Sequence, residues 1–271
     1  MPKVREEEPR TFTDFVQLIE QLQQTHAGPL WYRGTGCARF QLLPSLYRHR
    51  TVTAVDKLAK LESQLMTRFR QRSIPLHSRS LVDDWDALFF MQHYGVPTRL
   101  LDWTENPFIS LYFAVMSAPN IQGSNGQPRY SEDAAIWILD PVVWNRHSLR
   151  HTSYDGEVLT PGDDSLKSFK PAPTFTGMHK IPVALYGAHN SPRIVAQRGV
   201  FTIFGQNNKP MEKIFEDEQF PSDCLIKVVL KRSRIFTFRS SVLTYGVCES
   251  AVFPDLDGLA KEIRRTFAFE A

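Results

Sequence analysis

The sequence FMQHYGVPTRLLDWTENPFISLYFA, residues 90–114, places a dense group of polar residues between two apolar segments. The group contains a Gln-His-Tyr-Gly run, a Thr-Arg pair, an Asp-Trp-Thr triplet and an Asn-Pro pair. Packing alone needs little of this polar content, and polar groups crowded between core-forming segments are typical of binding sites. This stretch is therefore the predicted centre of the fold and of its site.

Local signals divide the first half of the stretch into a helix end, a turn and a strand. A helix is predicted to begin at Asp83 or Asp84, whose carboxylate accepts the free N–H groups of the first turn, and to stop at Gly95. Pro97 forces the residue before it into an extended conformation, so residues 98–103 are predicted to form a short strand.

The second half of the stretch contains a clear helix start. Asn106 is a preferred N-cap and Pro107 suits the first helical position, so residues 108–117 are predicted to form a buried apolar helix. Free N–H groups and the positive dipole end of that helix lie next to Asp102 and Thr104 in sequence. This arrangement predicts a phosphate-binding position at the helix start.

Upstream, two helices and a strand are predicted. The first helix is capped by Thr11 or Thr13 and ends near residues 27–29, and a short strand follows at residues 30–34 with Arg33 at its end. The second helix, residues 54–72, carries an apolar stripe. Its charged residues Lys57, Lys60, Glu62 and Arg68 are predicted to lie on the opposite, solvent-facing side.

Downstream, from residue 119, segments rich in turn-forming residues alternate with apolar segments, which predicts loops between strands and helices. A surface loop is predicted at residues 119–133 and irregular structure at 140–189. Two β-rich runs separated by Arg198-Gly199 predict a hairpin or bulged strand with Gln197 at the bend. The other predicted elements are strands at 134–139, 193–197, 200–204 and 225–230, and helices at 235–243 and 256–263.

This mixed order predicts an α+β fold, with flanking helices on a mixed or split, largely antiparallel sheet. The predicted organisation is an N-terminal helix at residues 1–29 followed by one compact unit at 30–271, with an irregular insertion at about 119–190.

The composition excludes some classes of protein. The formal charge of +3 does not by itself indicate nucleic-acid binding. No apolar run reaches the roughly 18 residues of a membrane span, and Cys37, Cys224 and Cys248 are too scattered for a disulfide framework. We therefore expect a cytoplasmic protein.

Two further clusters of polar residues resemble binding sites but are also explained without a ligand. His147 and His151 have the spacing of helical metal ligands but lack a third ligand, so no metal is expected. Basic residues interleaved with aromatic ones at 227–239 suit a nucleic-acid surface, but a solvated helix face explains them equally well. The signatures of P-loop, dinucleotide-binding and serine hydrolase folds are missing from the sequence.

Five motifs together resemble the FRG domain family, named after a Phe-Arg-Gly motif. They are WYRG at 31–34, LLPSLYR at 42–48, QHYGVPTRLLDWTENP at 92–107, RIVAQRGVF at 193–201 and VFPDLDGLAKEI at 252–263. They occur in the family's order, with Tyr32 in place of the Phe. FRG domains occur mainly in bacteria and phages, often near toxin or phage-defence genes, so the resemblance implies a toxin or defence effector with an antitoxin or operon partner.

A looser similarity links the chain to ADP-ribosyltransferases, which use a strand with an arginine, a polar strand leading into a helix, and a strand with a catalytic glutamate. Arg33 resembles the first element. The second is resembled by Asp102-Trp103-Thr104 followed by Asn106-Pro107 and Tyr112-Phe113-Ala114, whereas Gln197 stands where the glutamate is expected. This similarity implies an NAD-dependent enzyme that modifies a macromolecule, either protein or nucleic acid.

The similarity to ADP-ribosyltransferases implies roles for single residues. Arg33 grips the pyrophosphate, Thr104 and Asn106 orient the nicotinamide ribose, and an aromatic ring stacks on the nicotinamide. Asp102 is the first candidate for the carboxylate that stabilises the oxocarbenium centre, ahead of Glu249, and Gln197 holds a ribose hydroxyl. The remaining candidates around the pocket are Gly34, Gln92, His93, Arg99 and, for stacking, Tyr94, Trp103 or Phe201.

Two other functions stay open from the sequence. One is a non-catalytic module in which Arg33, Arg99 and the basic segment 227–239 bind the phosphates of a nucleotide or nucleic acid. The other is a hydrolytic or nuclease-like enzyme that uses His93 and Asp102 as acid and base.

Overall fold

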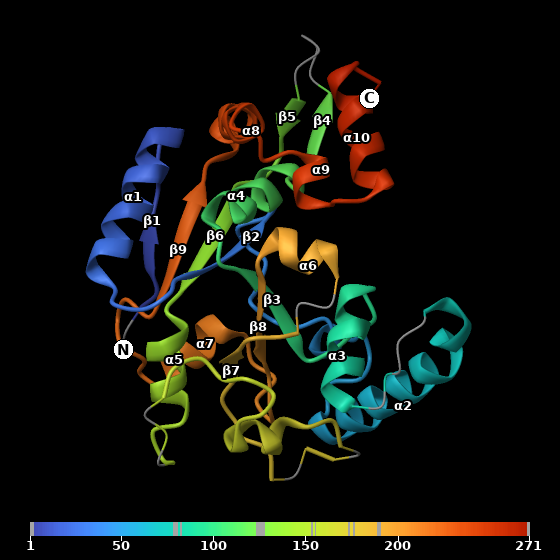
Figure 1. Cartoon of the computed structure of the whole chain (residues 1–271). Helices are drawn as coiled ribbons and strands as arrows, with labels where there is room; N and C mark the ends of the chain where they lie inside the picture. The colour runs from blue at the N-terminus through green and yellow to red at the C-terminus, as the bar shows by residue number, and fades with distance from the viewer. Residues whose placement is uncertain are drawn as a thin grey trace.

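A seven-stranded sheet forms the centre of the protein in the computed structural model, which describes residues 3–77, 81, 83–122, 128–152, 154, 156–172, 174–175, 177–188 and 191–269. β1 and β9 are parallel, and the other neighbouring strands are antiparallel. This confirms the predicted α+β fold with a largely antiparallel sheet (Figure 1). The strands in spatial order are β1 (Arg5–Glu7), β9 (Leu225–Leu230), β6 (Ala134–Leu139), β2 (Trp31–Thr35), β3 (Leu100–Thr104), β8 (Gly199–Ile203) and β7 (Val183–Leu185).

Helices cover both faces of the sheet. On one face pack α1 (Phe12–Thr25), α4 (Pro107–Met116) and α8 (Ile235–Thr244). On the other face pack α2 (Val55–Ser73), α5 (Pro141–Ser148) and α7 (Met211–Asp217). α3 (Asp84–His93) packs with α2 against the end of the sheet formed by β8 and β7.

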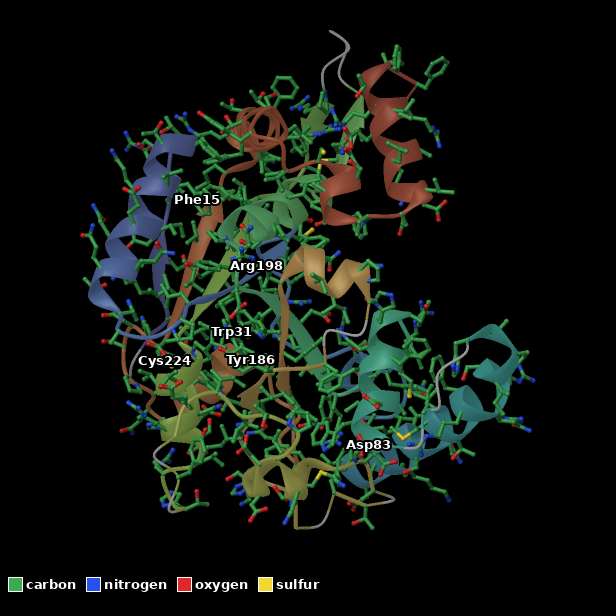
Figure 2. All side chains as sticks on the ribbon, viewed as in Figure 1. Phe15, Trp31, Asp83, Tyr186, Arg198 and Cys224 are labelled. Carbon is green, nitrogen blue, oxygen red and sulfur yellow. The ribbon has the colours of Figure 1, made fainter. Side chains whose placement is uncertain are left out.

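Buried aromatic residues lie on both faces of the sheet. Figure 2 shows that Phe15 of α1 and Trp31 of β2 lie in different parts of the interior, Trp31 next to Tyr186 with ring centroids 5.8 Å apart.

The remaining elements lie outside the central sheet and the helices that cover it. They are β4 (Asn120–Gln122), β5 (Pro128–Tyr130), α6 (Pro192–Gln197), α9 (Glu249–Val252), α10 (Leu256–Thr266) and the 3-10 turns η1 (Leu46–Arg48), η2 (Ile74–Leu76), η3 (Asp164–Phe169) and η4 (Arg232–Arg234). Within the described ranges, none of the helices has the length and apolar character needed to cross a bilayer.

Side-chain caps fix the helix starts that the sequence predicted. Thr11 and Asp14 form a capping box at α1, and Asp83 accepts hydrogen bonds from two backbone N–H groups at α3. Asn106 does the same at α4, where Pro107 is the first helical residue. These three starts are confirmed because a cap depends only on neighbours within one turn.

The phosphate position predicted at the start of α4 is wrong. The Asn106 side chain itself accepts from the N–H groups of Phe108 and Ile109, at 2.9 and 3.4 Å. Pro107 has no N–H, and the N–H of Ser110 already donates to the Asn106 carbonyl. The first turn of this helix therefore has no free donor for an anion.

Residues 193–197 form a helix, so the predicted strand there is wrong. Ser191 caps α6 by accepting from the N–H of Ile194, and Pro192 occupies its first turn. Arg198 then adopts a left-handed conformation with φ of 45°, which reverses the chain into β8. The cap and proline override the β propensity of Ile194 and its valine neighbour.

Other sequence predictions need smaller corrections. The predicted loop at 119–133 contains the hairpin of β4 and β5, while its residues 123–127 lie outside the described part of the chain. The segment 140–189 contains α5, η3 and β7 between irregular stretches. β1 was not predicted, because the charged sequence Arg-Glu-Glu lacks strand character and its pairing with β9 depends on the backbone.

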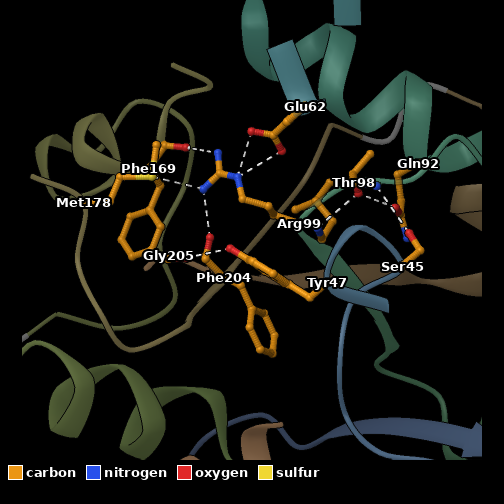
Figure 3. Close-up of polar contacts among 11 residues, drawn as sticks. Ser45, Tyr47, Glu62, Gln92, Thr98, Arg99, Phe169, Met178, Phe204 and Gly205 are labelled. Atoms are coloured by element: carbon orange, nitrogen blue, oxygen red, sulfur yellow. Dashed lines mark hydrogen bonds and ion pairs between the residues drawn. The ribbon is translucent and has the colours of Figure 1, made fainter. Parts of the chain in front are cut away.

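Glu62 is fully buried, so its predicted position on the solvent side of α2 is wrong. Both of its carboxylate oxygens accept from Nε of Arg99, at 2.9 and 2.8 Å, and Arg99 is also fully buried. Arg99 donates further to the carbonyls of Phe204 and Phe169 (Figure 3). Burial raises the pKa of Glu62, and the Arg99 charge opposes that rise. Arg99 thus joins α2, η3 and the residue that follows β8 within the core.

Gly34 provides the close contact between β2 and α4. A Cβ at this position would lie 1.8 Å from the carbonyl oxygen of Ser110 and 2.7 Å from the backbone nitrogen of Ala114. We expect Gly34→Ala to lower the free energy of unfolding by about 3 kcal/mol, since α4 must move away from the sheet. Chemical denaturation measures the loss. The control Gly162→Ala, where the nearest atom would be 3.9 Å away, is expected to change little, and equal stability of both variants would contradict this packing.

Candidate functional site

The sheet opens between β2 and β3. These strands pair only at Tyr32 and Thr104, whereas β2 pairs with β6, and β3 with β8, at five positions each. Past this pair, Nη1 of Arg33 donates to the backbone carbonyl of Asp102 at 2.6 Å. The guanidinium therefore bridges two strands that no longer share backbone hydrogen bonds.

A cavity of about 280 Å³ lies at this opening. Its walls come from β2, the end of α3, β3, α4, α6 and β8, segments that are far apart in the sequence. Nine predicted site residues line it together: Arg33, Gly34, Gln92, His93, Asp102, Trp103, Thr104, Gln197 and Phe201. The remaining lining residues are Tyr32, Phe113, Arg193, Ile194 and Gly199.

Asp102 presents a carboxylate to solvent from the middle of an internal strand. The other four residues of β3 are buried, while the Asp102 side chain is 55% exposed. Nε2 of Gln92 donates to Oδ2 of Asp102 at 2.8 Å, and Nη1 of Arg33 lies 3.9 Å from the same oxygen. A charged, exposed side chain on an internal strand has no packing role, so it is available to a ligand in the cavity.

Thr98 fixes the orientation of the Gln92 amide. Its hydroxyl donates to Oε1 of Gln92, which leaves Nε2 of Gln92 facing Asp102. The same hydroxyl accepts from the N–H of Leu100, and the N–H of Thr98 donates to the hydroxyl of Ser45 (Figure 3). Buried Thr98 therefore acts through Gln92 to position the Asp102 carboxylate.

Positive charge predominates around the cavity. Arg33 and Arg193 line it together with a single carboxylate, that of Asp102. Burial lowers the pKa of Arg33, and the charge of Asp102 acts in the opposite direction. Arg33 remains a cation at neutral pH, since guanidinium groups are not deprotonated in proteins. The guanidinium carbon of Arg193 lies 4.6 Å from the centre of the Phe253 ring, which holds it at the cavity wall.

His93 is the one lining residue whose side chain can gain or lose a proton near neutral pH. Burial lowers its pKa from the usual 6.5, and the positive charge of Arg193 lowers it further. Its Nδ1 lies 3.4 Å from the hydroxyl of Ser191. The imidazole is therefore neutral at pH 7 and able to accept a proton.

The lowered pKa of His93 predicts a pH dependence of stability. As pH falls below about 6.5, the unfolded chain binds a proton at this residue while the folded protein does not, so folding becomes less favourable. We expect wild type to lose more stability than His93→Gln between pH 7.5 and 5.5. Urea unfolding at a series of pH values measures this difference. Parallel pH profiles for the two proteins would contradict it.

Four predicted site residues lie outside the cavity. Arg99 is in the core with Glu62, and Asn106 is the cap of α4. Tyr94 is 62% exposed at the end of α3 and packs against Phe90 with ring centroids 4.8 Å apart.

The fourth, Glu249, is buried in α9, where Nε and Nη2 of Arg265 donate three hydrogen bonds to its carboxylate. Six residues were expected around one pocket, and five of them line the cavity: Arg33, His93, Asp102, Thr104 and Gln197. The sixth, Arg99, does not, because its charge is paired with Glu62 in the core.

Several lining residues already have partners. The hydroxyl of Thr104 donates to the carbonyl of Gln197 at 2.6 Å and accepts from the N–H of Asn106. The amide of Gln197 donates to the carbonyl of Val252 at 3.1 Å. Trp103 donates through its indole N–H to Thr202. Thr104 and Gln197 therefore join α6 to β3 and α9, and their side chains are only partly available to a ligand.

Arg193 is the most important lining residue that was not predicted. It belongs to the RIVAQRGVF motif, but the predicted strand concealed that α6 starts beside the cavity. Tyr32 and Gly199 also lie in motifs, and Ile194 follows Arg193 directly. Membership of these motifs is the signal in the sequence that points to these residues.

The two alternative clusters have partners within the chain. Nε2 of His147 donates to the carbonyl of Glu218, and among the described residues no group of three or more His, Cys, Asp or Glu side chains is placed to hold a metal ion. In the basic segment, Lys227 pairs with Glu6, and Lys231 pairs with Glu8 and Asp133. The acidic residues of and near β1 thus balance part of this positive charge.

Of the comparisons with known proteins, the one with protein-family models finds a match, and it covers one segment of the chain. No curated protein and no solved structure matches the chain. The FRG domain model matches residues 28–122, which include β2, α2, α3, β3 and α4. This range contains Arg33, Gln92, His93 and Asp102 but not the α6 wall of the cavity. The chain therefore carries an FRG domain at residues 28–122.

Proposed function

We propose that the cavity binds NAD and that the protein is an NAD-dependent ADP-ribosyltransferase-like enzyme. The observation that carries this proposal is the exposed Asp102 carboxylate, held beside Arg33 in a cavity where the sheet opens. A ligand with an anionic group and a developing positive centre matches this pair of charges. The pyridinium nucleotide NAD has both features.

The size of the cavity indicates which part of NAD it takes. At about 280 Å³ it is close to the lower limit of small-molecule sites, so it accommodates one end of a dinucleotide. We assign the nicotinamide ribose to the region near Asp102 and the pyrophosphate to Arg33, with Arg193 as a second cation. Phe201 and Phe113 provide the apolar wall against which a nicotinamide ring packs.

The proposed chemistry begins with cleavage of the bond between C1′ of the ribose and the nicotinamide nitrogen. The bonding electrons move to the pyridinium nitrogen, which leaves as neutral nicotinamide, and C1′ becomes an oxocarbenium-like centre. Asp102 stabilises this positive charge electrostatically. Gln92 keeps the carboxylate in place through its 2.8 Å hydrogen bond.

The second step transfers ADP-ribose to an acceptor. An acceptor nucleophile attacks C1′ and loses its proton to neutral His93, whose lowered pKa suits a base at pH 7. Water in place of the acceptor gives free ADP-ribose. The acceptor is a macromolecule, protein or nucleic acid, and the genomic settings typical of FRG domains suggest an effector in toxin or phage-defence systems, with an antitoxin or operon partner.

Non-catalytic nucleotide binding is the second candidate function. It is favoured by Gln197, which stands where a catalytic glutamate is expected and whose amide donates to the carbonyl of Val252. In that case Arg33 and Arg193 hold phosphates, and Asp102 makes a hydrogen bond to a ribose hydroxyl. Both functions use the same cavity but differ in whether the glycosidic bond breaks.

Incubation with doubly labelled NAD separates the two candidates. One label is on nicotinamide and the other on the adenylate, and the protein is tested alone and with cell lysate. We expect nicotinamide release in both reactions and adenylate label on a macromolecule in the second. Saturable NAD binding without release of nicotinamide would support the binding module instead. Failure to bind NAD at millimolar concentration would contradict both.

A further inference from the structure

The C-terminal helix α10 packs on the protein through its polar side. Arg265 donates to both carboxylate oxygens of Glu249, at 2.8 and 2.9 Å, and Glu262 accepts from the hydroxyl and N–H of Ser250. Gly258 lies so close to α9 that a Cβ there would be 2.0 Å from the carbonyl oxygen of Phe253. Positions 258, 262 and 265 share one helix face, which is the inward one.

The apolar side of α10 faces solvent. Leu256 is 82% exposed and Phe267, just past the helix end, is 70% exposed. Leu259 and Ile263 are also exposed, and the four residues follow one another at intervals of three, four and four. A single exposed apolar residue needs no explanation, but a stripe along a whole helix indicates an interaction surface. Figure 1 shows α10 at the edge of the molecule.

Charges along one flank of this stripe have opposite signs at the two ends of the helix. Asp257 lies in the first turn and Arg264 in the last, seven residues apart and therefore on the same flank. Neither makes an ion pair with any part of the chain that the structure describes. Lys261, between them, lies over the Phe253 ring with its Nζ 5.8 Å from the ring centre.

We propose that a second copy of this chain packs its own α10 antiparallel on this face, around a two-fold axis near Lys261. That axis brings Leu259 opposite Ile263 of the second copy and Leu256 opposite Phe267. Asp257 then faces Arg264 of the other copy, twice in the dimer. The midpoints of all three pairs fall within one residue of each other, so the apolar and the charged patterns are both self-complementary about one axis.

The sequence at the centre of the stripe suits this packing. Ala260 is exposed and small, so two helices approach closely where the axis crosses them. The contact of two three-turn helices is small compared with typical stable interfaces. The dimer is therefore weak and concentration-dependent, and its ion pairs weaken with salt. The proposal concerns a surface outside the cavity and does not rest on NAD binding.

Charge reversal at two exposed positions tests the pairing, and circular dichroism checks that α10 stays folded. Asp257→Arg and Arg264→Asp change exposed side chains, and each places like charges opposite one another in a homodimer. We expect wild type to dimerise in sedimentation equilibrium at low salt and each variant to associate at least about 10-fold more weakly. An equimolar mixture of the two variants restores opposite charges at both contacts, so association should return.

The apolar stripe has its own test. Leu259→Asp places a carboxylate in the centre of the contact and is expected to abolish the dimer, while circular dichroism reports an unchanged fold. Three results would overturn the proposal. They are a wild type that stays monomeric at the highest soluble concentration, charge variants that associate like wild type, and a mixture that associates no better than each variant alone.

Discussion

The variant Asp102→Asn is expected to release nicotinamide from NAD roughly 100- to 1000-fold more slowly than wild type. The substitution removes the negative charge that stabilises the oxocarbenium centre and keeps a side chain of the same shape. Its amide oxygen still accepts from Gln92, and the backbone carbonyl at position 102 still accepts from Arg33. Single-turnover kinetics with labelled NAD measures the effect on the chemical step.

Affinity separates catalysis from binding in this experiment. Asp102→Asn should bind NAD at least as tightly as wild type, because the carboxylate repels the pyrophosphate. Arg33→Lys is the matched variant for binding, since it keeps the charge but loses the fork geometry that suits a phosphate. It should raise the dissociation constant for NAD by about 10-fold or more. An Asp102→Asn variant with an unchanged rate of release would exclude the proposed role of Asp102.

Replacing Glu62 by leucine should lower the free energy of unfolding by about 3–5 kcal/mol, because the Arg99 charge stays buried without its counter-charge. Arg99 has no access to water and would keep the carbonyls of Phe204 and Phe169, the sulfur of Met178 and the ring of Phe175 as partners, all of them uncharged. A shift of the thermal midpoint of roughly 10 °C is expected. Differential scanning calorimetry measures both quantities.

A double-mutant cycle shows whether the pair itself causes this loss. The variant with both Glu62→Leu and Arg99→Met should be more stable than the sum of the single losses predicts, since it leaves no isolated charge. Arg150 and Glu218 form an ion pair at 3.0 Å on the surface, and Glu218→Ala serves as the exposed control with a much smaller effect. Additive losses in the core pair would contradict the argument.

The sequence predicted those elements whose cause is local. The caps Thr11, Asp83 and Asn106 act within one helical turn, and β6 consists of six buried apolar residues. Such signals need no knowledge of distant contacts. The helix α6 was predicted as a strand because its apolar residues suit both structures, although Ser191 and Pro192 form a local helix-start signal.

Long-range partners explain most of the other errors. Glu62 looks like a solvent residue until Arg99 is known to lie opposite it in the core. The carboxylate of Glu249 likewise meets Arg265 from a later helix. At the site, the motif residues Arg33, Gln92, His93 and Asp102 line one cavity, as predicted. The motifs do not show that the side chain of Asn106 caps its own helix and is therefore not available to a ligand.

A crystal structure of the protein soaked with NAD tests the central claim most directly. We predict the pyrophosphate within hydrogen-bonding distance of Arg33 and C1′ of the nicotinamide ribose facing the Asp102 carboxylate. Arg193 should approach the same ligand from α6. NAD bound away from this cavity, or bound in it with the nicotinamide ribose turned away from Asp102, would contradict the proposed function.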